Sequence, residues 1–246
     1  MYDLLKKKFG QNFLIDKNVL LKICKLIPRK NLNITEIGPG NGSLTEIILD
    51  YKPSKMVLVE IDTDLIKPLK NKFKNINNFK VINEDILKYE FEEKVDLIIS
   101  NLPYNISSQI LARICSLNIT PEYMILMFQK EFALRLLNKK INSLNSLVNC
   151  FYEIETNFNV SKFCFRPIPK VESKVLFFRK KIKPLLKKSE ISNFVEFKRE
   201  LFSYKRKLLK NTLKKYNFTD RKYELNQRVE DLSLNNLVNI FRSINF

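Results

Sequence analysis

The sequence contains no histidine and no tryptophan, and it has only four glycines and four cysteines in 246 residues. Without histidine, a Ser-His-Asp or Cys-His hydrolytic site cannot be assembled, so any proton transfer must use a carboxylate, lysine, tyrosine or water. The cysteines lie too far apart to suggest a metal site or a disulfide framework. We therefore expect reduced structural thiols and no bound metal. The cysteines are Cys24, Cys115, Cys150 and Cys164.

Long apolar runs are also missing. No stretch approaches the roughly 18–20 apolar residues that a membrane span needs, and the first residues do not resemble a secretion signal. We therefore expect a cytoplasmic protein that does not enter a membrane. The chain length is sufficient for one large core, or for one core with a small appended domain.

Acidic side chains are outnumbered by basic ones, 26 to 44, which gives a net charge of +18. Residues 179–246 carry 18 basic and 7 acidic side chains, a net +11, so the last quarter of the chain holds most of the excess. This distribution favours a polyanionic partner, because neutralising phosphates supplies sequence-independent affinity for nucleic acid. An A+T-rich genome is an alternative source of some of the surplus lysine.

The scarcity of glycine makes its positions informative. An average chain of this length would hold roughly 17 glycines, whereas three of the four here, Gly38, Gly40 and Gly42, lie in EIGPGNG. Glycine lets the backbone turn tightly and approach a ligand closely. The third glycine comes one residue too early for the dinucleotide pattern, and no nearby lysine makes a phosphate-binding Walker loop. A plain surface turn is the alternative.

Strand-like and helix-like segments alternate through most of the chain. Alternation with continuous apolar strands predicts a parallel sheet covered by helices on both faces. Two late strand-like segments predict an antiparallel pair that closes the sheet, and a Ser-x-x-Glu capping box is expected to begin the second helix. The expected strands are 33–37, 56–61, 79–83, 95–100, 123–128, 158–165 and 174–180; the expected helices are 17–27, 43–51, 62–74, 107–117, 129–140 and about 143–153.

A proline and a basic run near residue 182 indicate a domain boundary. Beyond it, flanked by basic side chains, apolar residues recur on one helix face, at Phe194, Phe197, Leu201, Tyr204 and Leu208. Residues 232–244 predict a final helix. We expect residues 1–181 to form the first domain and residues 182–246 a helical, basic domain that binds RNA.

Polar residues follow successive strands of the predicted sheet, at the edge where open α/β sheets bind their ligands. After the glycine turn comes Glu60, which can accept hydrogen bonds from both hydroxyls of a ribose. Asp85 follows the next strand and can accept one from an adenine amino group. Each acid alone also fits a helix cap or a solvated loop. Together with the glycine turn they favour a nucleoside-binding site.

The fourth strand ends in NLPY, residues 101–104. Asn101 offers an amide oxygen, and Pro103 biases Leu102 toward an extended backbone that leaves its carbonyl free. Tyr104 offers a flat face for a planar base. Two acceptors and an aromatic face suit an exocyclic amine that is turned toward a sulfonium methyl, a transfer that needs neither a base nor a metal. A turn with a packed tyrosine is the alternative.

In this order, EIGPGNG, VLVEID, NEDIL and NLPYNIS resemble the S-adenosylmethionine-dependent methyltransferase fold, and the Asn-Leu-Pro-Tyr form is similar to N6-adenine methyltransferases. The motifs FGQNFL, FQKEFALRL and FRPIPKVESKV narrow the resemblance to the small-subunit rRNA adenine N6,N6-dimethyltransferases. The match covers nearly the whole chain. It implies an α/β, Rossmann-like class I fold, with a seven-stranded, mostly parallel sheet whose last strand is antiparallel, and a small all-helical C-terminal domain.

The resemblance also implies roles for individual residues. S-adenosyl-L-methionine would bind at Asn12, Leu14, Gly38, Gly40, Glu60, Asp85 and Asn101. The target adenine would be held at Asn101, Leu102, Pro103 and Tyr104, and Phe165 would stack on its other face. A core aromatic is the alternative reading for Phe165.

The implied reaction adds two methyl groups to each of two adjacent adenines near the 3′ end of small-subunit rRNA, during ribosome biogenesis. We expect a monomer that acts on this rRNA or on a precursor particle. A large-subunit rRNA adenine methyltransferase of the macrolide-resistance type shares the NxPY motif, but FGQNFL and RKLLKNTL favour the first reading. A non-catalytic RNA-binding assembly or transcription factor is a third possibility, and the intact NLPY set argues against it. Segment 137–146 is shorter than usual in the family, which could alter RNA contacts.

Overall fold

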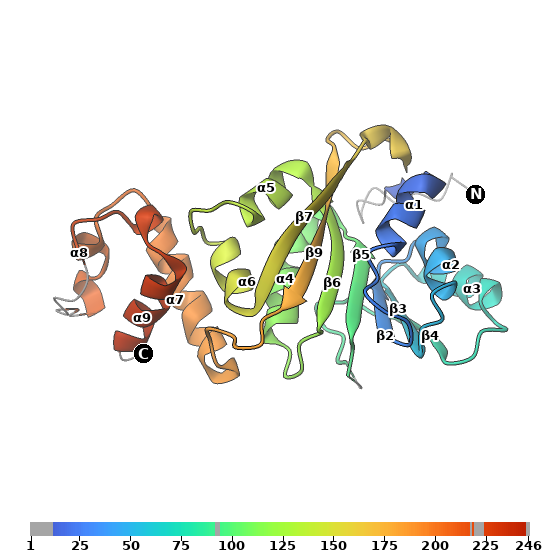
Figure 1. Cartoon of the computed structure of the whole chain (residues 1–246), viewed down its shortest axis with the longest axis horizontal. Coiled ribbons are helices and arrows are strands. Elements are labelled where there is room, and N and C mark those ends of the chain that lie inside the picture. Colours follow the sequence, from blue (N-terminus) through green and yellow to red (C-terminus); the bar gives the residue numbers. More distant parts are fainter. Residues whose placement is uncertain (1–11, 92–93, 217, 219–223, 245–246) are drawn as a thin grey trace. The chain divides into compact units, whose positions relative to one another are not determined.

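The computed structural model describes residues 12–91, 94–216, 218 and 224–244 (Figure 1). They form two compact units. The first holds the described residues up to Ala133 together with Ile154–Arg179, and the second holds Leu134–Glu153 and the described residues from Lys180 onward. This division differs from the expected single boundary after residue 181, because helix α6 (Asn145–Phe151) packs against α9 (Leu234–Ser243) in the second unit.

Seven strands form one sheet in the order β4-β3-β2-β5-β6-β9-β7. The strands β2, β3, β4, β5 and β6 all run parallel to one another, and β9 runs antiparallel to β6. This confirms the expected mostly parallel sheet whose last strand in the chain is antiparallel. The strands are β2 (Asn33–Ile37), β3 (Lys55–Glu60), β4 (Phe79–Asn83), β5 (Leu97–Asn101), β6 (Tyr123–Gln129), β7 (Tyr152–Val160) and β9 (Ser173–Lys180).

The central strand β5 is buried on both sides. Leu97, Ile98 and Ile99 are each fully buried, and successive side chains of a strand point to opposite faces of the sheet. Both faces are therefore covered, as the continuous apolar pattern predicted. The first unit has the helices α1 (Lys17–Cys24), α2 (Ser43–Leu49), α3 (Thr63–Lys72) and α4 (Ser107–Ser116). The division into units falls within α5 (Lys130–Leu136), after Ala133.

Helix α2 begins where expected but is capped differently. Its N-cap is Gly42, with φ +77°, and the side-chain oxygen of Asn41 accepts from the Ser43 N–H at 3.1 Å. The hydroxyl of Ser43 donates to Asn41 Oδ1 at 2.7 Å instead of capping the backbone. The predicted Ser-x-x-Glu capping box is therefore wrong. A Cβ at Gly42 would lie 2.9 Å from the ring of Phe73, so close packing of α2 on α3 requires glycine at this position.

The strand expected at 158–165 begins and ends earlier, because β7 is followed by a 3-10 turn at Lys162–Cys164. The hydroxyl of Ser161 accepts a hydrogen bond from the Phe163 N–H at 3.4 Å and caps this turn. After the turn, β8 (Phe165–Arg166) pairs antiparallel with β1 (Phe13–Leu14) in a separate two-stranded sheet. Residues 161–166 thus join the N-terminal part of the described chain.

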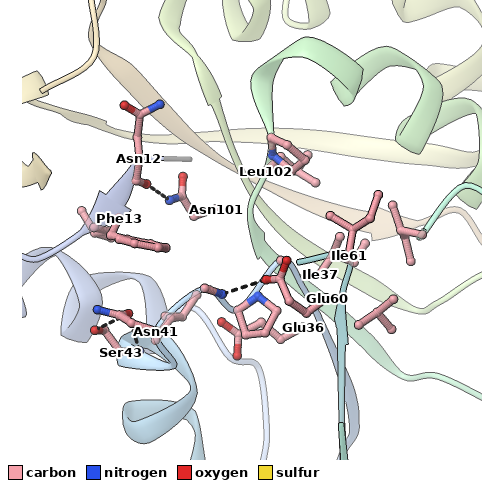
Figure 2. A pocket seen from close by; sticks show the side chains of 18 of the residues that line it. Asn12, Phe13, Glu36, Ile37, Asn41, Ser43, Glu60, Ile61, Asn101 and Leu102 are labelled. Atoms are coloured by element: carbon pink, nitrogen blue, oxygen red, sulfur yellow. Dashed lines mark hydrogen bonds between the residues drawn. The ribbon is translucent and has the colours of Figure 1, made fainter. Parts of the chain in front are cut away.

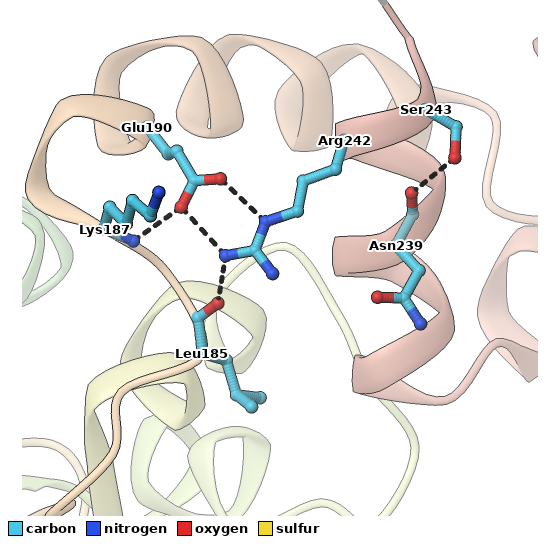
Figure 3. Close-up of polar contacts among 6 residues, drawn as sticks. All are labelled: Leu185, Lys187, Glu190, Asn239, Arg242 and Ser243. Atoms are coloured by element: carbon cyan, nitrogen blue, oxygen red, sulfur yellow. Dashed lines mark hydrogen bonds and ion pairs between the residues drawn. The ribbon is translucent and has the colours of Figure 1, made fainter.

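The second unit is built on aromatic packing between α7 (Ile191–Ser203) and α9. The rings of Phe194 and Phe241 meet edge to face with centroids 5.3 Å apart. Figure 3 shows Arg242 of α9, whose guanidinium donates to both carboxylate oxygens of Glu190 at 2.7 and 2.9 Å and to the Leu185 carbonyl at 2.8 Å. These bonds hold the start of α7 against the end of α9.

The apolar face predicted beyond Leu201 does not continue as a helix. Helix α7 ends at Ser203, Tyr204 is half exposed, and Leu208 forms an isolated bridge with Arg228. The basic residues 205–207 lie in the turn that follows α7. A short helix, α8 (Leu209–Thr212), comes next. Within the ranges that the structure describes, no helix is long and apolar enough to cross a membrane.

Candidate active site

A pocket opens at the carboxyl ends of β2, β3 and β5 (Figure 2). This is the edge at which parallel α/β sheets bind ligands. The residues that line it include every cofactor residue expected from the sequence and all four residues of NLPY. They are Asn12, Leu14, Gly38, Gly40, Glu60, Asp85, Asn101, Leu102, Pro103 and Tyr104.

Two glycines of the turn after β2 have different surroundings. Gly38 and Gly40 have φ of +62° and +60°, in the left-handed region that favours glycine. A Cβ at Gly38 would meet nothing within 4 Å, so the backbone there faces open space. A Cβ at Gly40 would lie 2.6 Å from the ring of Phe13. Phe13 therefore packs directly on the turn, a contact that the sequence did not indicate.

Glu60, at the end of β3, is 4% exposed and is held on both carboxylate oxygens. One oxygen accepts from the Gly40 N–H at 3.2 Å (Figure 2), and the other accepts from the Asp62 N–H at 2.9 Å. Burial raises the pKa of Glu60, while these backbone hydrogen bonds act in the opposite direction. A carboxylate has about four lone-pair sites, and the backbone of Ile61 also interacts with this one, so capacity for a ligand remains. The side chain is therefore fixed in place and can still accept hydroxyl groups.

Glu36 is a buried acid in the pocket that sequence reasoning missed. It belongs to β2, is 2% exposed, and accepts a hydrogen bond from the Thr45 hydroxyl at 2.6 Å. Burial is the main cause that raises its pKa to about 8, and the neighbouring Glu60 acts in the same direction. An ionisable residue near the end of a buried strand is costly to bury in its charged form, and this was the available signal in EIGPGNG.

Asp85 follows β4. The sequence allowed it either a structural role in a cap or loop or a role in ligand binding, and its two carboxylate oxygens are compatible with both. Its Oδ1 accepts from the Leu87 N–H at 2.9 Å and stabilises the turn that follows. Its Oδ2 has no hydrogen-bond partner among the described residues. Because Asp85 also lines the pocket, this second oxygen is available to a ligand.

The amide of Asn101 is oriented by Asn12. The side-chain nitrogen of Asn101 donates to the main-chain carbonyl of Asn12 at 2.9 Å (Figure 2). A carbonyl oxygen can only accept, so the nitrogen must face it and Oδ1 must point elsewhere. Among the described residues Oδ1 has no hydrogen-bond partner. Asn101 therefore presents an oxygen acceptor, as its proposed role requires.

The rest of NLPY adds a second acceptor and a fixed ring. The Leu102 carbonyl accepts no hydrogen bond from the residues that the structure describes. The hydroxyl of Tyr104 lies 2.6 Å from that of Ser173, which is fully buried on β9. Burial raises the pKa of Tyr104, and the hydrogen bond with Ser173 opposes this. Tyr104 is thus neutral and anchored through its phenolic oxygen. No local sequence pattern predicted this contact between Tyr104 and Ser173.

Phe165 is not brought to the pocket. It pairs with Leu14 through the backbone, is fully buried in the hydrophobic core, and does not line the pocket. In this conformation the alternative reading, a core aromatic, describes its position. Stacking of Phe165 on an adenine requires that its ring leave this core position, and this role stays a prediction.

The chain matches the family model described as "Ribosomal RNA adenine dimethylase" over residues 2–245. It belongs to this family. A similar curated protein is "Ribosomal RNA small subunit methyltransferase A" of Mycoplasmopsis pulmonis, which is 41% identical over 225 residues, or 88% of this chain and 86% of that protein. The protein of the same name from a Hydrogenobaculum species is 36% identical over 97% of this chain and 93% of its own length.

Solved structures agree with the fold. A dimethyladenosine transferase from Plasmodium falciparum superposes with a TM-score of 0.80 at 25% identity, covering 93% of this chain and 95% of that one. The 23S rRNA methyltransferase ErmE gives a TM-score of 0.70 at 23% identity, over 94% of this chain and 99% of its own, which shows the shared fold alone. The chain is therefore an rRNA methyltransferase of the class I fold, and its methyl donor is S-adenosyl-L-methionine.

The pocket fits this donor. Gly38 leaves open space beside the backbone, and Asp85 has an oxygen without a partner within the described residues. Two acidic side chains, Glu60 and Asp85, line a pocket that would receive a cationic sulfonium, whereas the pKa of about 8 keeps the third acid, Glu36, protonated at neutral pH. Opposite charges attract most strongly where water is excluded.

Proposed function

We propose that this protein transfers methyl groups to the N6 atoms of two adjacent adenosines near the 3′ end of small-subunit rRNA. The observation that supports it best is the orientation of Asn101, whose amide oxygen is left free by the bond to Asn12 in the pocket that holds the cofactor residues. The names of the curated relatives support the small subunit as substrate.

The donor-binding residues act by shape and by hydrogen bonding. Glu60 accepts hydrogen bonds from the ribose hydroxyls, and the free Asp85 oxygen accepts one from the adenine amino group. Gly38 allows the main chain to approach the ligand closely, because no side chain intervenes. When bound, S-adenosyl-L-methionine supplies a methyl group on a sulfonium centre whose sulfur departs uncharged.

Asn101 and Leu102 position the amine that receives the methyl group. Their two carbonyl oxygens accept hydrogen bonds from the two N–H groups of the unmodified adenine amine, which draws the nitrogen toward tetrahedral geometry and frees its lone pair. After each methyl group is gained the nitrogen releases one proton to water, so one N–H remains to be held in the second transfer. Tyr104 stacks on the base, which must leave its helix to enter the pocket. Fixed acceptors that need no reorganisation account for most of the acceleration in this scheme.

The helical unit supplies affinity for RNA in this proposal. Residues 205–207, a Lys-Arg-Lys sequence in the turn after α7, are exposed and carry three positive charges. Such charges bind phosphates without reading sequence. Selection of the target adenosines then depends on RNA shape and on the pocket.

Mass spectrometry of rRNA tests this function. The purified protein and S-adenosyl-L-methionine are incubated with three substrates: small subunits that lack adenine dimethylation, fully modified small subunits, and large subunits. We expect two neighbouring N6,N6-dimethyladenosines near the 3′ end of the unmodified small-subunit rRNA only. Modification of large-subunit rRNA would favour the macrolide-resistance type, and no transfer at all would favour a non-catalytic RNA-binding role.

A further inference from the structure

Phe163 is an aromatic side chain on the surface of the methyltransferase unit. Phe163 is 65% exposed, whereas Phe165, two residues later, is fully buried. A single exposed apolar side chain is common on protein surfaces, so the surroundings of this ring decide what it can bind.

The backbone beneath this ring is held on both sides. The N–H of Cys164 donates to the Ser161 carbonyl at 3.0 Å, and the Cys164 carbonyl accepts from the Ile15 N–H at 2.9 Å. The guanidinium of Arg166 donates to the carbonyls of Phe163 and Phe165, at 3.4 and 2.9 Å. A ring on a fixed backbone loses little conformational freedom when it binds a flat partner, so it is well suited to stacking.

Positive charge surrounds the ring. The Lys162 ammonium lies 5.4 Å from the Phe163 ring centroid, and Arg166 of β8 and Lys170 of the following loop are exposed. The carboxylate of Asp16 lies on the other side of this segment, at 3.7 Å from the Cys164 sulfur. The acid of this loop, Glu172, is paired with Lys130 at 2.8 Å. An aromatic face among cations is the arrangement by which proteins bind single-stranded nucleic acid.

The position of the ring relates it to the pocket. Phe165 pairs with Leu14, which lines the pocket, and Phe163 is two residues away from Phe165. The Cα atoms of Phe163 and Leu14 are therefore at most about 13 Å apart. In Figure 1 this segment is the gold turn beside α1, and the hydrogen bond from Ile15 confirms that the two segments are neighbours.

We propose that Phe163 is a stacking platform for an unpaired nucleotide that flanks the target adenosine, and that Lys162 and Arg166 bind the adjoining phosphates. The proposal rests on the proposed function, since it concerns the same RNA at the same site. It places an RNA contact on the methyltransferase unit itself, separate from the basic turn at 205–207. It predicts that RNA with an unpaired nucleotide beside the target binds better than RNA without one.

Tryptophan fluorescence tests the platform directly, because the chain contains no tryptophan. In the Phe163→Trp variant the only indole lies at the platform, and stacking of a base quenches it. The matched control is Ile119→Trp, which replaces a residue that is 60% exposed ahead of β6, at the opposite edge of the sheet from the pocket. Titration with a single-stranded oligonucleotide of the small-subunit 3′ end should quench the first variant and leave the control unchanged.

Kinetics supply the second measurement. Removing the ring in Phe163→Ala should raise the KM for RNA roughly 5- to 100-fold, as expected for one stacked base, with kcat changed less than about two-fold. Phe163→Tyr keeps an aromatic face and should retain the wild-type KM. Circular dichroism of each variant excludes misfolding as the cause.

Failure of the platform and failure of the proposed function have different signatures. If Phe163→Trp transfers methyl groups normally but RNA does not quench its fluorescence, the platform is wrong and the function stands. If ribosomal protein, and not RNA, quenches the indole, the surface binds protein and the proposal is overturned. If the wild-type protein does not methylate small-subunit rRNA, the function itself fails, whatever the fluorescence shows.

Discussion

The phenolic oxygen of Tyr104 lies 2.6 Å from the hydroxyl oxygen of Ser173. This contact joins the loop after β5 to the start of β9, and so connects the NLPY motif with the end of FRPIPKVES. The ring that is to receive the adenine is thus held by a residue almost seventy positions later in the chain. Two motifs that appear independent in the sequence form one structural unit.

Loss of this hydrogen bond should weaken catalysis without unfolding the protein. Ser173→Ala removes one neutral hydrogen bond, for which about 0.5–1.5 kcal/mol is typical, so we expect a roughly three- to ten-fold lower kcat. Tyr104→Phe should have the same effect, and the double variant should be no worse than either single one, since both remove one interaction. Steady-state methyl transfer measures all three.

A matched control for this series is Ser146→Ala. Ser146 is fully buried, and its hydroxyl has no partner among the described residues. We expect unchanged kcat for it. Additive losses in the Ser173 and Tyr104 double variant would show that the hydrogen bond does not couple the two residues.

The glycine turn yields a prediction about stability. Gly38→Ala and Gly40→Ala impose the same strain, about 1–2 kcal/mol, because both residues have φ near +60°. Only at Gly40 does the new methyl group meet the Phe13 ring, at 2.6 Å. We expect a larger loss of thermal stability for Gly40→Ala, measured without cofactor. In a Phe13→Ala background the two losses should become equal; a persistent difference would contradict the contact.

Glu36 should make stability depend on pH. Its pKa is about 8 in the folded protein against an ordinary 4.5, so between these values the folded state binds a proton that the unfolded chain releases. The free energy of unfolding must therefore fall as the pH rises through this window, and it is unaffected by this group below pH 4.5. Glu36→Gln removes the ionisable group.

Denaturant unfolding at pH 5 and pH 8 checks this prediction. The free energy of unfolding of the variant should increase relative to that of the wild type as the pH rises, because only the wild type has a buried carboxyl group at position 36 that must become charged. Glu60 is present in both proteins, and because it interacts with Glu36 the difference between the two pH profiles reports on this coupled pair. Parallel pH profiles would show that Glu36 is ionised in the fold throughout.

The basic turn after α7 should control the salt dependence of RNA binding. Replacing Lys205, Arg206 and Lys207 by glutamine should reduce the slope of log affinity against log salt by about 2, since each phosphate contact in single-stranded RNA contributes about 0.7. A control variant with Lys67, Lys70 and Lys74 changed loses the same charge from α3 and from the turn that follows it. An unchanged slope in the first variant would mean that residues 205–207 do not bind phosphate.

The sequence was sufficient for the sheet and for most of the site. The strands β2 and β4 have the predicted bounds, because short apolar runs between turn residues specify buried strands. Gly38, Glu60, Asp85 and Asn101 converge on one pocket because parallel strands present their carboxyl ends at the same edge. The local sequence pattern predicts the strands, and the parallel topology predicts that the residues at their ends meet.

Contacts that depend on distant segments could not be predicted. Ser173 meets Tyr104, and Phe13 meets Gly40, only once the chain has folded. The burial of Phe165 depends on pairing with Leu14, about 150 residues earlier. Helix α6 joins the second unit because of its packing on α9, a preference that its own sequence does not contain.

The rate of methyl transfer by Asn101→Ala tests the central claim most directly. It is measured in a single turnover, with S-adenosyl-L-methionine and unmethylated small subunits both saturating, and RNA affinity is measured in parallel. If Asn101 and Leu102 hold the adenine amine, the rate should fall about 100- to 1,000-fold, as when a preorganised polar group is lost, while RNA affinity stays within about two-fold. A rate close to that of the wild type would contradict the account.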